Sequence, residues 1–491
     1  MKVAVIGIDG FDPVLFERFR ADLPALDRIA REGSFSPLRS VVPPDSVPAW
    51  CSIYTGLTPP EHGILHSFNY LDRKKDDFRP DVGVFQGKTF WDRAGNAGRR
   101  VLILNPFMAY PAWDVNGIMV SGPVFEGGEV SARPETVLED YDFPPLGGIV
   151  DFPAKTAIPE FVERTKKLTE DQAEVFRKMA EEKPWDLLFA TFLTFDRLGH
   201  FTWRFTDPED PTYPGPTSVE STIRDAYRQY DRIIASFMEI LPPETALLII
   251  SDHGHGRRCT RVFNVNEFLR QKGYLASKVK GWPLLSKHYW LEVAKVKALQ
   301  FFARHEMEDF AFRIVRWIPN RKALKKSTHI TSVPSSLAHS PDFDGTNPTG
   351  GINVSRRVCE ERKIDYDGFR KELIDELLQL RDPKTGKGIF RWIKKREEVY
   401  REGDHLAEFP EILFELEPEY GVSWNLHTGL YGTNATHRKI SGGHRPEGVL
   451  FGWKTPELRK EKPSVLDLAP SILSLLGVEP LKEQRGEVLF R

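Results

Sequence analysis

The sequence is poor in cysteine and in net charge, and each shortage excludes a class of protein. Its 491 residues hold only three cysteines, far apart, which excludes a disulfide framework and a CxxC-type zinc site. Its 68 basic and 70 acidic side chains leave a formal charge of −2, so the balance of charge favours neither nucleic acid nor an anionic membrane as a partner. The composition therefore gives no sign of a polyanion-binding function.

Long hydrophobic runs are missing as well. No stretch of 18 apolar residues occurs, so no membrane span is expected. The N-terminus reads "MKVAVIGIDG", with one basic residue and an apolar run that stops at Asp9, which is too short for a secretory signal. We therefore expect a soluble, cytoplasmic protein, and its oligomeric state stays open.

Short apolar runs alternate with amphipathic patterns over the first half of the chain. Buried strands are predicted at 3–8, 185–193 and 245–250. The other elements predicted there are a helix at 23–33, a helix, turn and strand across 88–105, and helices at 156–182 and 221–240. This order predicts an α/β fold, with a mostly parallel sheet sandwiched by helices.

The composition of the chain changes between residues 260 and 440, which are richer in charged residues, tryptophan and irregular segments. We predict that 260–440 is an inserted cap that shapes the substrate pocket, while 1–259 and 441–491 form the core. A strand at 444–453 and a helix at 464–478 would rejoin the sheet. Some cap residues could face a substrate, although such residues more often belong to a core or an interface: Trp282, Trp290, Trp317, Trp424, His339 and His427.

Possible metal ligands follow three of the predicted strands. Asp9 ends the first strand, Asp196 follows the strand at 185–193, and Asp252 with His253 follows the strand at 245–250. In an open α/β sheet, ligands bind beyond the carboxyl ends of the strands. Each residue alone has an ordinary explanation as a helix cap, a surface pair or a turn. Their coincidence at one sheet edge favours a metal site.

Two histidines extend this set. In "FDRLGH", Asp196 and His200 are four residues apart and share one face of a helical turn, so both can reach one ion. His444 lies in the glycine-rich stretch "SGGHRPEG", where a side chain can be turned inward. Carboxylate and imidazole groups suit zinc or manganese.

Ser46 stands at the mouth of the proline-rich stretch "VVPPDSVPAWCSIYTGLTPPEHGIL", residues 41–65. Pro48 fits the first turn of a helix, where backbone N–H groups have no partner to lose. A hydroxyl at such a helix N-terminus is well placed to meet an anion. Asp45 is a weaker alternative whose ordinary role is capping.

The ordered motifs resemble the alkaline phosphatase superfamily. The closest resemblance is to its type I phosphodiesterase/nucleotide pyrophosphatase branch, and within it to prokaryotic phosphohydrolase/phosphomutase-type members. In chain order the motifs read "VIGIDG", "VVPPDSVPAWCSIYTGLTPPEHGI", "FDRLGHFTWRF", "SDHGHG" and "GGHRPEGVLF".

The resemblance implies two divalent cations, zinc ahead of manganese. One would be held by Asp196, His200 and His444. The other would be held by Asp9, Asp252, His253 and the Ser46 oxygen. Three carboxylates and two divalent cations leave one net positive charge, which attracts a phosphate. We therefore expect a phosphoserine intermediate at Ser46 and its release by metal-held water. The substrate would be a small phosphodiester or phosphoanhydride.

Some positions depart from the family's pattern. The nucleotide pyrophosphatase branch usually has threonine as nucleophile, where this chain has Ser46. The branch also has an asparagine some twenty residues after the nucleophile; in this chain the equivalent position falls near Ser67, with Asn69 two residues later. Sulfatases carry an arginine where this chain has Trp50, which argues against sulfatase activity. His62 and His255 are expected to brace loops, and Arg445 either meets a phosphate or lies on the surface.

Other functions remain open at this point. The same metal site could serve a phosphomutase, another phosphotransferase or a phosphomonoesterase, because all of them share the phosphoryl-transfer step. A non-catalytic metal-binding module is a minor alternative. All six predicted ligands and the nucleophile are present, whereas a relative that had lost its activity would normally lack some of them.

Overall fold

The computed structural model describes residues 1–65, 84–125, 127–148, 150, 152–279, 285–317, 327 and 330–490. The chain divides into two compact units. The core unit comprises residues 1–257 and 442–491, and the insert unit comprises residues 258–441. Among the described residues, no helix is long and apolar enough to cross a bilayer.

The core unit is built on an eight-stranded sheet with the order β2-β17-β7-β1-β6-β3-β4-β5. The five strands from β7 to β4 run parallel to one another, whereas β17 and β5 pair antiparallel with their neighbours. The bounds are β1 Lys2–Ile8, β2 Ser34–Arg39, β3 Val101–Leu104, β4 Gly117–Ser121, β5 Ser131–Arg133, β6 Leu187–Phe192, β7 Thr245–Ile250 and β17 Glu447–Trp453.

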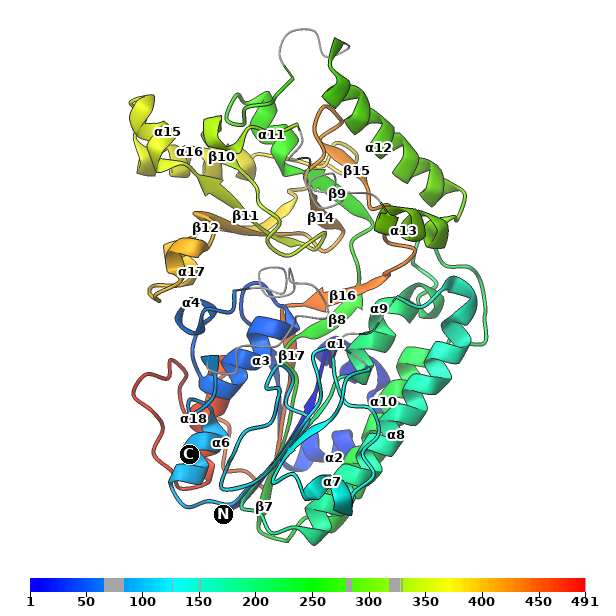
Figure 1. Ribbon diagram of the computed structural model, residues 1–491, viewed down its shortest axis with the longest axis vertical. Coiled ribbons are helices and arrows are strands. Elements are labelled where there is room, and N and C mark those ends of the chain that lie inside the picture. Colours follow the sequence, from blue (N-terminus) through cyan, green and yellow to red (C-terminus); the bar gives the residue numbers. More distant parts are fainter. Residues whose placement is uncertain are drawn as a thin grey trace. The chain divides into compact units, whose positions relative to one another are not determined.

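Helices cover both faces of this sheet because its central strands are apolar on both sides (Figure 1). All six residues of β6 and of β7 are buried. One face carries α3 (Ser46–Thr55), α4 (Pro59–His62), α6 (Phe90–Asn96) and α18 (Leu468–Leu475); the other carries α1 (Pro13–Phe19), α2 (Pro24–Glu32), α8 (Ile158–Glu182), α9 (Thr194–Thr206) and α10 (Thr222–Ile240). The predicted α/β sandwich is confirmed.

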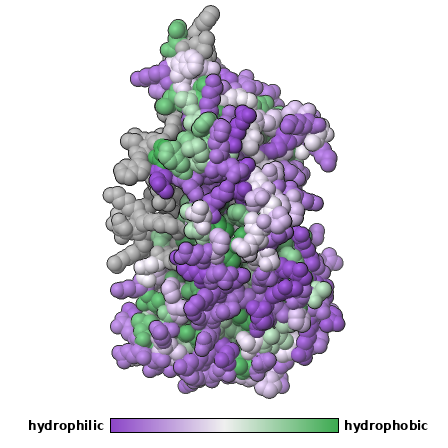
Figure 2. Space-filling model, turned by 90° about the vertical axis from the view of Figure 1, so that its right-hand side faces the viewer, coloured by the Kyte–Doolittle hydropathy of each residue, from purple (hydrophilic) through white to green (hydrophobic). Residues whose placement is uncertain are grey.

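The long helices α8 and α10 are amphipathic. In α10, buried residues such as Ile223, Tyr227, Tyr230 and Ile234 recur every three or four positions, which is one helix face. The surface that these two helices present is largely hydrophilic (Figure 2). Burial of the apolar stripe therefore orients each helix on the sheet.

Each strand and helix predicted for the core occurs within a few residues of its expected bounds, with one difference. The strand predicted at 444–453 is two strands, β16 (Gly442–Arg445) and β17, which meet at Pro446. Strand β16 pairs with β8 (Gly254–Arg257) in a separate two-stranded ribbon. Strand β2, with the sequence "SFSPLR", was not predicted; it contains Pro37, which fits its place at the edge of the sheet.

The insert unit has its own core and two small sheets, ordered β10-β11-β13-β12 and β14-β9-β15. Its strands are β9 Arg261–Asn264, β10 Ala338–His339, β11 Thr349–Val354, β12 Phe390–Lys395, β13 Ile412–Leu416, β14 Tyr420–Ser423 and β15 Tyr431–Thr433. Its helices are α11 Val265–Gln271, α12 Lys287–Arg304, α13 Glu308–Trp317, α15 Arg356–Glu361, α16 Tyr366–Leu378 and α17 Arg396–Val399.

Among the aromatic residues that could have faced a substrate, Trp424 belongs to this core, where its Nε1 donates to Pro341 O at 3.0 Å. Trp290 is 52% exposed on α12. Trp282 and the side chain of Trp317 lie outside the described residues. His339 lies on β10, and His427 Nε2 is 3.3 Å from Ser277 Oγ. That the insert shapes a substrate pocket stays a prediction.

Candidate functional site

The sheet brings three of the predicted aspartates to one edge. Strands β7, β1 and β6 are neighbours, with Ile8 opposite Phe192 and Gly7 opposite Ile250. Asp9 directly follows β1, Asp252 follows β7, and Asp196 lies in the first turn of α9 after β6. The strand-end rule that predicted this convergence therefore describes the backbone correctly.

Asp9, Asp252 and His253 form a first group, named cluster A here. One ligand atom from each lies within 4.8 Å of the others. His253 Nε2 is 3.3 Å from Asp252 Oδ2 and 3.6 Å from Asp9 Oδ1. Ser46 Oγ contacts this cluster, at 2.9 Å from His253 Nε2 and 3.3 Å from Asp9 Oδ1.

Asp196, His200 and His444 form a second group, cluster B. His200 Nε2 lies 3.1 Å from Asp196 Oδ2 and 3.1 Å from His444 Nε2, and the last atom lies 3.8 Å from Asp196 Oδ1. His200 and Asp196 share one turn of α9, while His444 comes from β16. The seven predicted site residues thus lie in the two clusters or, for Ser46, beside one of them.

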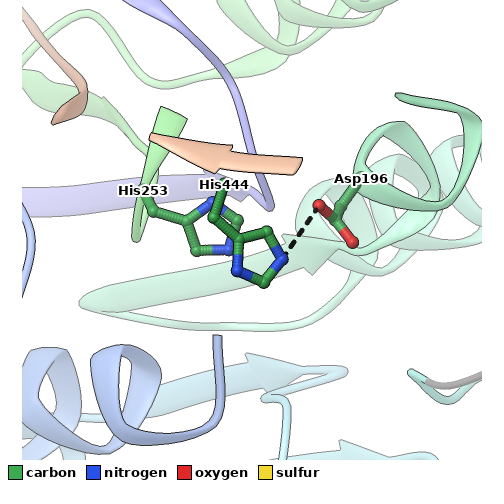
Figure 3. Close-up of side chains that lie close together, drawn as sticks. All are labelled: Asp196, His253 and His444. Atoms are coloured by element: carbon green, nitrogen blue, oxygen red, sulfur yellow. Dashed lines mark ion pairs between the residues drawn. The ribbon is translucent and has the colours of Figure 1, made fainter. Parts of the chain in front are cut away.

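The two clusters adjoin. The imidazole rings of His253 and His444 stack with centroids 4.1 Å apart and planes at 28°. Ligand atoms of Asp196, His253 and His444 also lie within 4.8 Å of one another, and Figure 3 shows these three side chains facing one small volume. Together the clusters form one continuous site.

Helix α3 holds Ser46 at its N-terminal end. Asp45 caps the helix, because its Oδ1 accepts a hydrogen bond from Val47 N at 2.9 Å. Gly56, with a φ of 71°, ends the helix in the left-handed conformation. The Ser46 hydroxyl therefore lies where backbone N–H groups and the helix dipole favour an anion.

Burial shapes the charge of the site. Burial raises the pKa of the Asp9 carboxyl well above its usual value, and the charges of Asp252 and Asp196 raise it further. Burial and the Asp196 charge likewise raise the pKa of Asp252. Burial also opposes ionisation of Asp196, but His200, His255 and His444 together outweigh it and hold the pKa of Asp196 well below its usual value. Burial lowers the pKa of His444 well below its usual value.

These residues fit divalent cations. Asp252 Oδ2 and His444 Nδ1 are buried, and neither makes a hydrogen bond within the part of the chain that the structure describes. Three carboxylates gathered in a dry site repel one another unless a cation lies between them. Oxygen and imidazole nitrogen are the donors that zinc and manganese accept.

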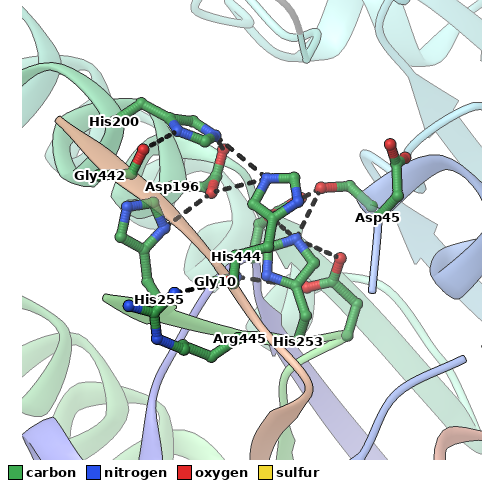
Figure 4. Close-up of polar contacts among 12 residues, drawn as sticks. Gly10, Asp45, Asp196, His200, His253, His255, Gly442, His444 and Arg445 are labelled. Atoms are coloured by element: carbon green, nitrogen blue, oxygen red, sulfur yellow. Dashed lines mark hydrogen bonds and ion pairs between the residues drawn. The ribbon is translucent and has the colours of Figure 1, made fainter. Parts of the chain in front are cut away.

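Two further ring N–H donors reach the aspartates: His255 was expected only to brace a loop, and Trp50 was given no role at the site. Trp50 Nε1 donates to Asp9 Oδ2 at 3.0 Å from the same helix as Ser46. His255 Nδ1 lies 3.0 Å from Asp196 Oδ1 (Figure 4). The only sequence signal was the i,i+4 spacing of Ser46 and Trp50, which puts both on one face of α3.

The remaining candidates have structural contacts. His62 braces a loop, with Ser52 Oγ 3.0 Å from its Nε2 and Ile64 N donating to its Nδ1 at 3.2 Å. Arg445 Nη1 donates to the backbone oxygen of His444 at 3.1 Å, and its Nη2 donates to the backbone oxygen of Arg257. Ser67 and Asn69, considered as partners for a phosphate oxygen, lie outside the described residues.

The sequence model of the family described as Type I phosphodiesterase / nucleotide pyrophosphatase matches residues 3–438. The chain belongs to this family. The predicted membership is confirmed, and the chain is accordingly a phosphoric ester hydrolase of the alkaline phosphatase superfamily. The matched range contains every residue of both clusters except His444.

One solved structure supports the fold of this phosphodiesterase-family protein. Phosphonoacetate hydrolase from Sinorhizobium meliloti 1021, in complex with phosphonoacetate, has a TM-score of 0.56 and 14% identity, over 97% of this chain and 96% of that chain. Human ectonucleotide pyrophosphatase / phosphodiesterase 5 aligns over 99% of this chain and 97% of that chain at 14% identity, with a TM-score of 0.48, too low to bear on the fold. A search among curated proteins finds no significant match.

Proposed function

We propose that this chain hydrolyses phosphodiesters or phosphoanhydrides through a covalent phosphoserine at Ser46, with two divalent cations, zinc ahead of manganese. The observation that carries the proposal is the contact of Ser46 Oγ with cluster A, at 2.9 Å from His253 Nε2 and 3.3 Å from Asp9 Oδ1. Cluster B adjoins through the stacked rings of His253 and His444. A hydroxyl beside two adjoining carboxylate–imidazole clusters suits phosphoryl transfer.

In this proposal cluster A with Ser46 holds one cation and cluster B holds the other. Bound there, the cations lower the pKa of the serine hydroxyl and offset negative charge on the phosphoryl oxygens. Ser46 Oγ releases its proton to solvent and attacks phosphorus, and the bond from phosphorus to the leaving oxygen breaks with its electron pair, which leaves that oxygen to take up a proton from solvent. Water then attacks the phosphoserine, cleaves the Oγ–phosphorus bond and returns the serine hydroxyl. The N-terminus of α3 stabilises the anion throughout.

The test combines metal content with a panel of esters. The protein is purified without chelator, its zinc and manganese are measured, and bis-p-nitrophenyl phosphate is compared with p-nitrophenyl phosphate and p-nitrophenyl sulfate. We expect about two zinc per chain, faster turnover of the diester, and none of the sulfate. Faster turnover of the monoester would reassign the substrate class to a monoesterase or a mutase. No metal after reconstitution would overturn the proposal.

Trp50→Phe is expected to weaken zinc binding at cluster A by about tenfold, because Asp9 Oδ2 loses the ring N–H that orients it. Competition with a chromogenic chelator measures the change. Trp91→Phe is the matched control, since Trp91 is also fully buried in the same apolar core but its Nε1 has no hydrogen-bond partner among the described residues. Equal losses in both variants would assign the effect to packing instead.

A further inference from the structure

His255 is a buried histidine outside both clusters. It lies on β8, directly opposite His444 in the β8–β16 pairing, and is 1% exposed. Its Nδ1 lies 3.0 Å from Asp196 Oδ1, while the other carboxylate oxygen of Asp196 lies 3.1 Å from His200 Nε2. The carboxylate of Asp196 is therefore bonded to His255 through Oδ1, which also lies 3.8 Å from His444 Nε2, and contacts His200 through Oδ2.

The ring of His255 sits in a slot that two glycines leave open. A Cβ at Gly199 would lie 2.5 Å from His255 Nε2, and a Cβ at Gly442 would lie 2.3 Å from the same atom. Trp203 stands alongside, with ring centroids 5.9 Å apart. Any side chain at either glycine would displace the imidazole, so the slot fixes where its Nδ1 points.

The same slot determines which ring nitrogen donates. His255 Nε2 is buried and has no hydrogen-bond partner in the described part of the chain. Nδ1 has one, the carboxylate oxygen of Asp196. A neutral imidazole with its proton on Nδ1 satisfies this carboxylate and leaves no buried N–H without an acceptor. His255 is thus a hydrogen-bond donor to Asp196.

We propose that His255 is a positioning residue that fixes the carboxylate of Asp196 through Oδ1, so that Oδ2 faces His200 of cluster B. The inference rests on the proposed metal site and deepens it. Outer hydrogen bonds of this kind orient metal ligands and restrict their rotation. The competing arrangement is direct ligation, because ligand atoms of Asp196, His200 and His255 also lie within 4.8 Å of one another.

Three substitutions separate these roles. An asparagine amide reaches the place of Nδ1, whereas a glutamine amide reaches the place of Nε2. We expect His255→Ala to weaken zinc binding at one of the two sites by about 10- to 100-fold, His255→Asn to recover most of the loss, and His255→Gln to recover little. Zinc affinity is measured on the metal-free protein by chelator competition, independently of turnover.

A second variant tests the slot without removing the imidazole. Gly199→Ala changes no polar atom, and alanine suits a helix interior better than glycine. Because the added Cβ must displace His255, we expect zinc affinity to fall as in His255→Ala. His62→Ala is the control, since it removes another buried histidine of the core unit, one that bonds to Ser52 and Ile64. Thermal unfolding identifies any variant that is unfolded.

The outcomes are distinguishable. Wild-type zinc affinity in both His255→Ala and Gly199→Ala would overturn the positioning role while leaving the proposed function intact. Complete loss of one zinc in His255→Ala that asparagine does not recover would assign His255 as a direct ligand. Recovery by glutamine equal to that by asparagine would also refute a donor at Nδ1. Absence of zinc from the wild type would instead refute the metal site itself.

Discussion

Ser46→Ala is expected to abolish turnover of phosphodiesters while leaving the metal content of the protein unchanged. The substitution removes only the Oγ that contacts His253 Nε2 and Asp9 Oδ1. The three members of cluster A still provide a complete ligand set within 4.8 Å. Loss of a covalent nucleophile lowers kcat by about a thousandfold or more. Steady-state assays and metal analysis on the same preparations measure both quantities.

Two companion variants make this result specific. Ser52→Ala removes another serine hydroxyl of α3, one bonded to His62 rather than to a cluster, and should keep full turnover. Ser46→Thr keeps a hydroxyl at the same place and should retain part of it. Acid quenching of the wild type during turnover should trap one phosphoryl group on Ser46, detected by peptide mass spectrometry. Undiminished turnover by Ser46→Ala would exclude Ser46 as the nucleophile.

The sequence predicted the sheet edge well because strand periodicity is local information. Each buried strand is a short apolar run, and the residue that follows it is read directly from the chain. Parallel pairing then brings the ends of β7, β1 and β6 together, so Asp9, Asp196 and Asp252 converge. The Asp196–His200 pair likewise needed only the helix repeat.

What the sequence left unpredicted depends on contacts between distant segments. The role of His255 follows from the β8–β16 pairing and from the gap at Gly199, neither of which shows in a local pattern. Arg445 was expected either to meet a phosphate or to lie on the surface, and its guanidinium donates to backbone oxygens of β8 and β16. The direction of a long side chain is set by its partners rather than by its neighbours in sequence.

Asp252→Asn is expected to make the metal-free protein more stable at pH 8 while abolishing nearly all of its turnover. Asp252 has no exposed surface, and its Oδ2 accepts no hydrogen bond among the described residues. Burial and the Asp196 charge raise its pKa in the folded protein above the unfolded value. The stabilising contribution of the Asp252 side chain to the free energy of unfolding is therefore fully present below the unfolded pKa, near 3.8. It is lost as pH rises through the raised pKa of the folded protein.

It follows that the metal-free variant should be more stable than the metal-free wild type at pH 8, because its neutral amide does not have to ionise in a dry site. Denaturant unfolding at pH 5 and pH 8 measures this difference. Between pH 5 and pH 8 the free energy of unfolding should fall more for the wild type than for Asp252→Asn. Asp22→Asn is the control of opposite sign, since hydrogen bonds from Arg228 and Arg224 hold the pKa of the Asp22 carboxyl below its usual value, so this carboxylate stabilises the folded protein at pH 8.

Zinc should invert the order of stability. At a free zinc concentration about a thousandfold above Kd, the wild type gains about 4 kcal/mol of unfolding free energy from each site, while Asp252→Asn gains little at cluster A. The variant should also lose nearly all turnover. A variant that is less stable than the wild type without metal at pH 8, or equally stabilised by zinc, would show that the Asp252 carboxylate is held by protein groups alone. The expected inversion would instead mean that cluster A holds its buried charge in order to bind a cation.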